Sequence, residues 1–222
     1  TGSTWRRDGV SRHHLAPQIF PESLVFTPDD IFSGRIPSGR VVVYDDDHFY
    51  LGVVLAEYCR KNGCEVTLIT PAAVVSSWTV HTLEQETIQA DLLKKGIKIL
   101  PHHFVRPGQK TNPEAVHIYT ESVPYEAKIL DCSALVLVTA RLPNSGLESA
   151  LEAVRNSWDE AGIKSVTRIG DALAPATIAA AVYSGRRYAR ELDEDIDPDA
   201  VPFERELIEI AAEPDWETFW LE

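Results

Sequence analysis

The sequence contains no methionine, only three cysteines and no long apolar run. Because it lacks an initiator methionine and opens on the polar stretch Thr1–Arg7, we expect a fragment, a chain processed from a larger protein, or a natural start whose methionine was trimmed. No apolar segment approaches the roughly 20 residues that a membrane-spanning helix needs, so we expect no span. Cys59, Cys64 and Cys132 form neither a C-x-x-C pair nor a zinc-type spacing, which predicts small buried side chains in a reducing compartment.

Positive charge is also scarce. The chain has 21 Lys and Arg against 34 Asp and Glu, a formal net charge of −13 and a pI near 5.0. Nucleic acids and anionic lipids attract basic patches, so this balance disfavours both as partners. No signal peptide opens the chain, and we therefore expect a cytoplasmic protein.

Strand and helix patterns alternate after a loop-like start over residues 1–37. The run Arg40–Asp45 is typical of a buried parallel strand, and Leu51–Asn62 has helical spacing that ends at Gly63. Glu65–Thr70 predicts a second strand, so the strand–helix–strand unit takes about 30 residues, as a crossover between parallel strands does. We expect one face of this helix to be buried, formed by Val54, Leu55, Tyr58 and Cys59.

The remaining pattern predicts an α/β fold with a parallel sheet and a small antiparallel insert. Thr82–Gln85 has the form of a capping box that opens a helix through Lys95. The other expected elements are strands at Ile97–Leu100, Ala134–Thr139 and Val166–Ile169, a hairpin of Val116–Thr120 with Tyr125–Leu130, and helices at Leu147–Asp159 and Pro175–Leu192.

The C-terminal tail combines acidic and apolar residues. Glu191–Asp199 is interpreted as a solvated linker, and apolar side chains follow it at Pro202, Phe203, Trp216, Phe219 and Trp220. These side chains favour docking of the tail onto another surface, with a plain disordered end as the alternative.

The turn after the first strand departs from a dinucleotide-binding turn. Such a turn needs G-x-G-x-x-G, and the three glycine positions are Asp47, Phe49 and Gly52 here. Only the helix-packing glycine remains, Phe49 fills the space of a phosphate, and Asp45–Asp47 place negative charge where a phosphate should bind. The second strand ends at Thr70 rather than at an acid that would hold a ribose. We therefore expect no NAD(P)H binding.

Other patterns that carry chemistry are weak. Asp45–Asp47 offers three carboxylates to a cation, but neighbouring strand residues point to opposite faces, so we expect solvated or helix-capping carboxylates and no metal. Seven histidines, including the pairs His13–His14 and His102–His103, show no H-E-x-x-H spacing and are expected on exposed loops. No G-x-S-x-G nucleophile elbow occurs, so we assign no catalytic residue.

Taken in order, several segments resemble the C-terminal region of trimethylamine, dimethylamine and histamine dehydrogenases, iron–sulfur flavoproteins of the old-yellow-enzyme type. The segments that carry the resemblance are Val41–Thr70, Thr82–Glu84, Arg168–Ala172 with Pro175, Ile178 and Gly185–Arg186, the opening Thr1–Gly2 with Trp5 and Asp8–Gly9, and Pro202–Glu206. In that family an N-terminal barrel holds FMN and substrate and a Cys-bound 4Fe–4S cluster follows. Electrons leave to a protein acceptor such as an electron-transferring flavoprotein.

The resemblance implies a Rossmann-like, three-layer parallel sheet of the glutathione-reductase type. Residues 35–145 would form an NAD(P)H-like domain with a degenerate motif, and residues 1–34 and 146–222 would form parts of an ADP- or FAD-like domain. The first strand and Gly-rich loop of the latter are expected before Thr1. The barrel, the FMN site and the cluster cysteines lie outside this sequence. A homo-oligomer is also implied.

Gly170 and Asp171 are the residues we assign to a nucleotide by this resemblance, with Thr1 and Gly2 nearby. A carboxylate ahead of a helix can accept a ribose hydroxyl, and the free amides of the helix can meet a pyrophosphate. An Asp in this position is otherwise an ordinary N-cap. The ligand would be ADP or FAD.

The leading interpretation is the nucleotide-fold part of an amine dehydrogenase. One alternative is an NAD(P)H-dependent reductase domain similar to dienoyl-CoA or disulfide reductases. The other is a non-catalytic docking module that uses a Rossmann fold without its nucleotide.

Overall fold

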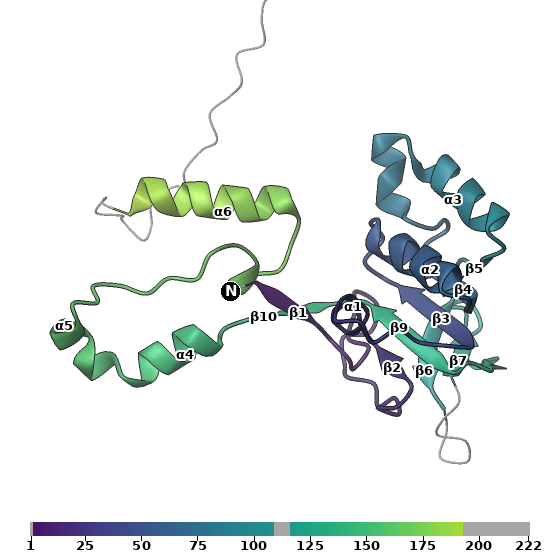
Figure 1. Cartoon of the computed structure of the whole chain (residues 1–222), viewed down its shortest axis with the longest axis horizontal. Helices are drawn as coiled ribbons and strands as arrows, with labels where there is room; N and C mark the ends of the chain where they lie inside the picture. The colour runs from purple at the N-terminus through teal and green to yellow at the C-terminus, as the bar shows by residue number, and fades with distance from the viewer. Residues whose placement is uncertain (1, 109–115, 193–222) are drawn as a thin grey trace, which may run out of the picture.

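The structure is a computed structural model that describes residues 2–108 and 116–192 (Figure 1). Its centre is a parallel sheet of five strands in the order β2-β9-β3-β4-β5. The strands are β2 (Val25–Phe26), β9 (Ala134–Val138), β3 (Arg40–Asp45), β4 (Glu65–Ile69) and β5 (Lys98–Leu100). Val43 in the middle strand lies between Leu68 and Val136 in register, and the side chains of all three are fully buried. The expected α/β fold with a parallel sheet is confirmed.

Helices cover one face of the sheet (Figure 1). They are α1 (Pro28–Phe32), α2 (Leu51–Lys61) and α3 (Gln85–Lys94), the last preceded by the 3-10 helix η1 (Ser77–Thr82). Alternate strand residues such as Val41 and Val43 point to this face and pack with Leu55, Cys59 and Leu92 in one apolar cluster. A strand buried on both faces requires the continuous apolar runs that the sequence shows.

A second, antiparallel sheet covers the other face. It consists of β6 (Phe104–Pro107), β7 (Val116–Tyr119) and β8 (Lys128–Leu130) in that order. Val42, Tyr44 and Leu135 point toward it and pack with Val105 and Val116. This part of the chain, which we call the body, therefore has three layers: the helices, the parallel sheet and the antiparallel insert. The expected hairpin is the β7–β8 pair.

Two short strands lead from this body to an arm. β1 (Ser3–Trp5) pairs antiparallel with β10 (Arg141–Pro143). After β10 the chain forms α4 (Gly146–Ala153), the 3-10 helix η2 (Arg155–Ser157), α5 (Trp158–Ala161), the 3-10 helix η3 (Gly170–Ala172) and α6 (Ile178–Glu191). Figure 1 shows these elements away from the five-stranded sheet. Neither α4 nor α6 contains a buried residue, so the arm has little core of its own.

Of the elements expected in the arm, one strand is absent from the described residues and one helix is divided. Residues Val166–Ile169 form no strand, because no strand of the described residues lies beside them to accept their backbone hydrogen bonds. The helix expected at Leu147–Asp159 is interrupted after Ala153, where the chain tightens into a 3-10 turn and the Trp158 indole Nε1 donates to the Leu151 carbonyl at 2.9 Å.

Two local details of the body also differ from expectation. Thr82 ends η1, and its hydroxyl donates to the Glu84 carboxylate at 2.6 Å, so the capping box does not form and α3 starts without a side-chain cap. On α2 the buried face contains Gly52, Val53, Leu55, Ala56 and Cys59, whereas Val54 and Tyr58 are exposed. Of the expected linker Glu191–Asp199, Glu191 ends α6 and Leu192 is its C-cap, whereas the rest of the linker and the docking tail, residues 193–222, lie outside the described residues.

Among the described residues, no helix combines the length and the apolar character needed to cross a membrane.

The buried central strand predicts a large effect of truncation. Leu135 on β9 is fully buried, and Leu135→Ala should lower the free energy of unfolding by about 2–5 kcal/mol, because the change removes apolar contacts and leaves a cavity. Leu15→Ala, at a side chain that is 85% exposed, is the control and should change stability little. Urea unfolding followed by tryptophan fluorescence measures both; equal effects would contradict this packing.

Candidate functional site

The turn between β3 and α2 is occupied by a side chain of the chain itself. The Asp45 carboxylate oxygen Oδ1 accepts the backbone N–H groups of Asp47 and His48, each at 3.1 Å. In a dinucleotide-binding turn the amides ahead of the helix face a phosphate. In this chain the Asp45 carboxylate already accepts two of these amides.

Gly52 allows this arrangement. A Cβ atom built on Gly52 would lie 2.5 Å from Asp45 Cγ, a distance that no side chain tolerates. The first turn of α2 therefore packs directly against the Asp45 carboxyl group. Phe49, at the second glycine position of the motif, stacks on Trp78 with ring centroids 5.6 Å apart and closes the outer side of the turn.

Burial dominates the electrostatics of this turn. Asp45 is fully buried, its Oδ2 has no hydrogen-bond partner among the described residues, and burial raises the pKa of its carboxyl group above the ordinary value. Burial also raises the pKa of Asp47, against the opposing effect of Arg141 and Arg12. A second anion at this turn would therefore meet negative charge in a site of low dielectric constant.

A cleft of about 990 Å³ lies beside the turn. Phe49, Trp78 and Asp47 of the body line one part of it, and the residues that lead into α6, Pro175–Ala179, line another. Its remaining walls come from Trp5, Arg12, Tyr50, Leu51, Thr139 and Arg141. The cleft thus combines aromatic rings with two guanidinium groups and the start of a helix, the kinds of group that bind planar anions.

Asp171, the residue assigned to a nucleotide, makes three contacts within the protein. Its Oδ2 accepts Arg141 Nη1 at 3.0 Å and Ser3 Oγ at 3.3 Å, and its Oδ1 accepts the Ala176 amide at 3.2 Å. Arg141 Nη2 also donates to the Ala176 carbonyl at 3.0 Å. Asp171 therefore ties together β1, β10 and the segment that leads into α6.

The other predicted site residues lie around Asp171. Gly170 has a φ of +57°, which glycine adopts without strain, and its amide donates to Ser184 Oγ at 3.0 Å. Gly2 precedes Ser3 directly, and its carbonyl accepts the Asn144 amide at 2.9 Å. The structure thus brings Gly2, Gly170 and Asp171 to one end of the β1–β10 pair. Thr1 lies outside the described residues.

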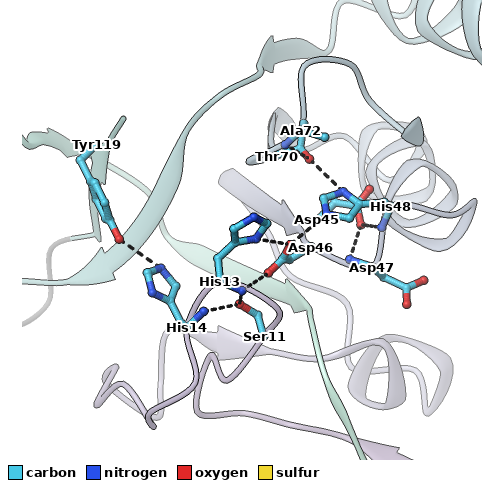
Figure 2. A network of polar contacts seen from close by, with 10 residues as sticks. All are labelled: Ser11, His13, His14, Asp45, Asp46, Asp47, His48, Thr70, Ala72 and Tyr119. Carbon is cyan, nitrogen blue, oxygen red and sulfur yellow. Dashed lines mark hydrogen bonds and ion pairs between the residues drawn. The ribbon is translucent and has the colours of Figure 1, made fainter. Parts of the chain in front are cut away.

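A cluster that the sequence analysis missed lies on the other side of the turn (Figure 2). Asp46 Oδ1 is 2.9 Å from His13 Nδ1 and 2.9 Å from His48 Nε2. His48 and His117 are buried, so the expectation of exposed loop histidines is wrong for them. The sequence did not indicate the cluster, because His13 lies 33 residues before Asp46 and only the fold brings the two side chains together.

The cysteines are poor nucleophiles. Cys59 and Cys64 are buried, and burial raises the pKa of both thiols, that of Cys59 to about 11. Cys132 is half-buried, and burial raises its pKa to about 11 as well. Since the thiolate is the reactive form, none of the three is activated.

Residues 26–128 match the family model described as the OYE-like second alpha/beta domain. The match covers β3, β4 and β5 of the parallel sheet together with α1, α2 and α3, and it ends before β9.

The chain as a whole is similar to amine dehydrogenases. It is 31% identical to dimethylamine dehydrogenase of Hyphomicrobium sp. (strain x), over 93% of this chain and 30% of that protein. The structure of histamine dehydrogenase from Rhizobium sp. 4-9 matches with a TM-score of 0.84 and 42% identity, over 95% of this chain and 32% of that one. A 6-hydroxypseudooxynicotine amine oxidase from Pseudomonas geniculata N1 matches with a TM-score of 0.72 and 36% identity, over 84% and 27%.

The chain is therefore homologous to enzymes of the dimethylamine and histamine dehydrogenase type, which are oxidoreductases. It spans about a third of the length of these relatives.

The buried Asp45 carboxyl group predicts a pH-dependent stability. Because its pKa is raised in the folded state, its favourable contribution is complete below the unfolded pKa of about 3.9 and is lost as the pH rises through the folded pKa. Asp45→Asn keeps the oxygen that accepts the Asp47 and His48 amides but removes the charge. The variant should gain stability over the wild type between about pH 4 and pH 7, with no gain below that window.

Thermal unfolding across this pH range measures the difference. Asp159→Asn, at an exposed carboxylate, is the matched control and should show no such pH-dependent gain. A constant difference between Asp45→Asn and the wild type at every pH would show that Asp45 is not held as a buried acid.

Proposed function

We propose that this chain is the nucleotide-fold portion of an FMN and 4Fe–4S amine dehydrogenase that oxidises an amine and passes the electrons to an external acceptor. The similarity to dimethylamine and histamine dehydrogenases over 93% and 95% of the chain is the observation that carries the proposal. In such an enzyme FMN takes the electrons from the amine and the cluster relays them. Neither group is assigned to residues of this sequence.

The role proposed for these residues is that of a scaffold of the glutathione-reductase type. Residues 35–145 correspond to an NAD(P)H-like domain, and residues 1–34 and 146–222 to parts of an ADP- or FAD-like domain. β2 pairs with β9, and Phe20 and Ile31 pack in the body clusters, which favours moving the first boundary to a point before Phe20.

ADP or FAD is the nucleotide proposed for this portion, with Gly170, Asp171, Gly2 and Thr1 near it. The side chains of the cleft fit an anionic nucleotide, because Arg12 and Arg141 supply positive charge and the segment before α6 borders the same space. Asp171 holds Arg141 and the Ala176 amide in position. Its role here is to orient these groups.

NAD(P)H is not a substrate in this proposal. The support is the Asp45 carboxylate, which accepts the two amides of the β3–α2 turn and leaves them no hydrogen to donate to a pyrophosphate. A reductase of the dienoyl-CoA type would need this turn open. The electron acceptor proposed is a protein, such as an electron-transferring flavoprotein, and the proposed assembly is a homo-oligomer that includes the N-terminal barrel.

Exposed apolar side chains favour a second candidate, a non-catalytic docking module. Ile178 and Val182, one turn apart on α6, are both largely exposed. A module of this kind would bind a partner through such a face and perform no redox chemistry.

The native polypeptide that carries this sequence tests the two candidates. The leading proposal predicts the visible absorption of a flavin and of an iron–sulfur cluster, both bleached by an amine without oxygen, and reoxidation by an electron-transferring flavoprotein. A native polypeptide that carries this sequence and holds neither group would contradict the amine dehydrogenase and leave the docking module.

A titration with NADH and NADPH tests the blocked turn. The chain of 222 residues should show no saturable binding up to about 1 mM, which corresponds to less than about 4 kcal/mol of binding free energy. Asp45→Ala, which frees the amides of Asp47 and His48, is the comparison that isolates the effect of the internal carboxylate. Micromolar binding to the wild type, measured by calorimetry, would instead favour the NAD(P)H-dependent reductase.

A further inference from the structure

Two imidazoles and one carboxylate converge at the carboxyl end of β3 (Figure 2). His13 Nδ1, Asp46 Oδ1 and His48 Nε2 all lie within 4.8 Å of one another. Both nitrogens approach the same oxygen at 2.9 Å. The three side chains come from the N-terminal loop and from the segment just after β3, so the fold and not the local sequence brings them together.

Asp46 and His48 form the buried part of the cluster, and His13 forms its solvent-exposed side. The side chain of Asp46 has no exposed surface and that of His48 is 7% exposed, whereas His13 is 41% exposed. An ion that reached Asp46 past His13 would therefore be shielded from water on most sides. A charged carboxylate with no exposed surface needs a compensating charge or several hydrogen bonds.

Further contacts orient two of the three side chains, Asp46 and His48. The Asp46 Oδ2 atom accepts the His13 amide at 3.4 Å, which leaves Oδ1 directed at the two rings. His48 Nδ1 lies 3.4 Å from the Thr70 hydroxyl, so Nε2 faces Asp46. Such outer contacts fix the ring orientation of metal-binding histidines.

The backbone of His48 is held in an unusual conformation. Its φ is +68°, which costs energy for a residue other than glycine, and its amide is bonded to Asp45 Oδ1 at 3.1 Å. The internal carboxylate that closes the dinucleotide turn thus also turns His48 toward Asp46. Strain of this kind at a residue of a polar cluster points to a use for that residue.

We propose that His13, Asp46 and His48 bind a divalent transition-metal ion of the Zn²⁺ class. Two imidazole nitrogens and one carboxylate oxygen suit Zn²⁺ and its first-row neighbours, whereas Ca²⁺ and Mg²⁺ prefer oxygen ligands alone. Three protein ligands leave one position of a tetrahedral ion for water. The site lies outside the cleft that we assign to a nucleotide, and it does not depend on the proposed amine dehydrogenase activity.

The two contacts to Asp46 need only a small opening, and the two ring nitrogens already lie within 4.8 Å of each other. Ligands about 2.0–2.1 Å from a tetrahedral Zn²⁺ lie about 3.3 Å from one another, a few tenths of an ångström more than the 2.9 Å contacts to Asp46. His13 is on a loop whose neighbour Leu15 is 85% exposed, so this loop provides the movement. The bound ion replaces the two N–H···O hydrogen bonds with two nitrogen–metal bonds, and a ring protonated on both nitrogens releases one proton to solvent.

The test is a Zn²⁺ titration of the full 222-residue chain after removal of metals with a chelator. At pH 7.5 we expect one equivalent to bind and to raise the unfolding temperature, because the ion stabilises the folded state alone. Co²⁺ in the same site should give the intense visible absorption of a tetrahedral ion. His13→Gln and His48→Gln should each weaken Zn²⁺ binding by about 10–100-fold or more, since loss of even a supporting contact has an effect of this size.

The matched control is His14→Gln. His14 is the neighbour of His13, but its Nε2 is bonded to the Tyr119 hydroxyl at 3.2 Å and not to Asp46, so this variant should bind Zn²⁺ as the wild type does. His13 lies near the surface and its replacement leaves the core intact; circular dichroism checks that every variant is folded.

Three results would overturn the proposal. One is the absence of stoichiometric Zn²⁺ binding to the folded wild type. The second is equal binding by the wild type and by His13→Gln. The third is a loss of binding in His14→Gln as large as in His13→Gln. In each case the cluster would be a set of hydrogen bonds that holds the N-terminal loop without an ion.

Discussion

The Asp45 carboxylate at the end of the central strand determines how the surrounding structure is arranged. It accepts the amides of the turn, it fits only because residue 52 is a glycine, and it holds His48 in its strained conformation. In a nucleotide-binding fold this position is left for the ligand, and the glycines of the motif serve that purpose. Here the Asp45 carboxylate occupies that position. The parallel sheet keeps its packing, but the turn loses the free amides of Asp47 and His48.

Much of the fold was predictable, because the central strands are buried on both faces and leave continuous apolar runs. Arg40–Asp45 matches β3 and Leu51–Asn62 matches α2 nearly residue by residue. The arm was harder to predict. Val166–Ile169 has the composition of a strand, but a strand forms only beside a partner, and the described residues supply none there. β2 was missed because a pair of residues carries no periodic signal.

The candidate site was also predictable only in part from the sequence. Sequence identified the altered turn, since glycine positions have a fixed spacing within one segment, and it placed Gly170 and Asp171 ahead of a helix. It gave no indication that Arg141 would bind Asp171 at 3.0 Å or that His13 would reach Asp46, because both contacts join segments that are distant in sequence. Side chains from a loop, a strand end and a helix start meet only once the chain has folded.

The β1–β10 pair has a mechanical consequence for the cleft. The cleft has one wall on the body, at Phe49 and Trp78, and another on the arm, at Pro175–Ala179, and this two-stranded ribbon runs between the two parts. Two-stranded ribbons adopt a wider range of twist than strands within a larger sheet. The width of the cleft therefore follows the angle of the ribbon, so a molecule that filled the space between Trp78 and α6 would also fix the orientation of the arm.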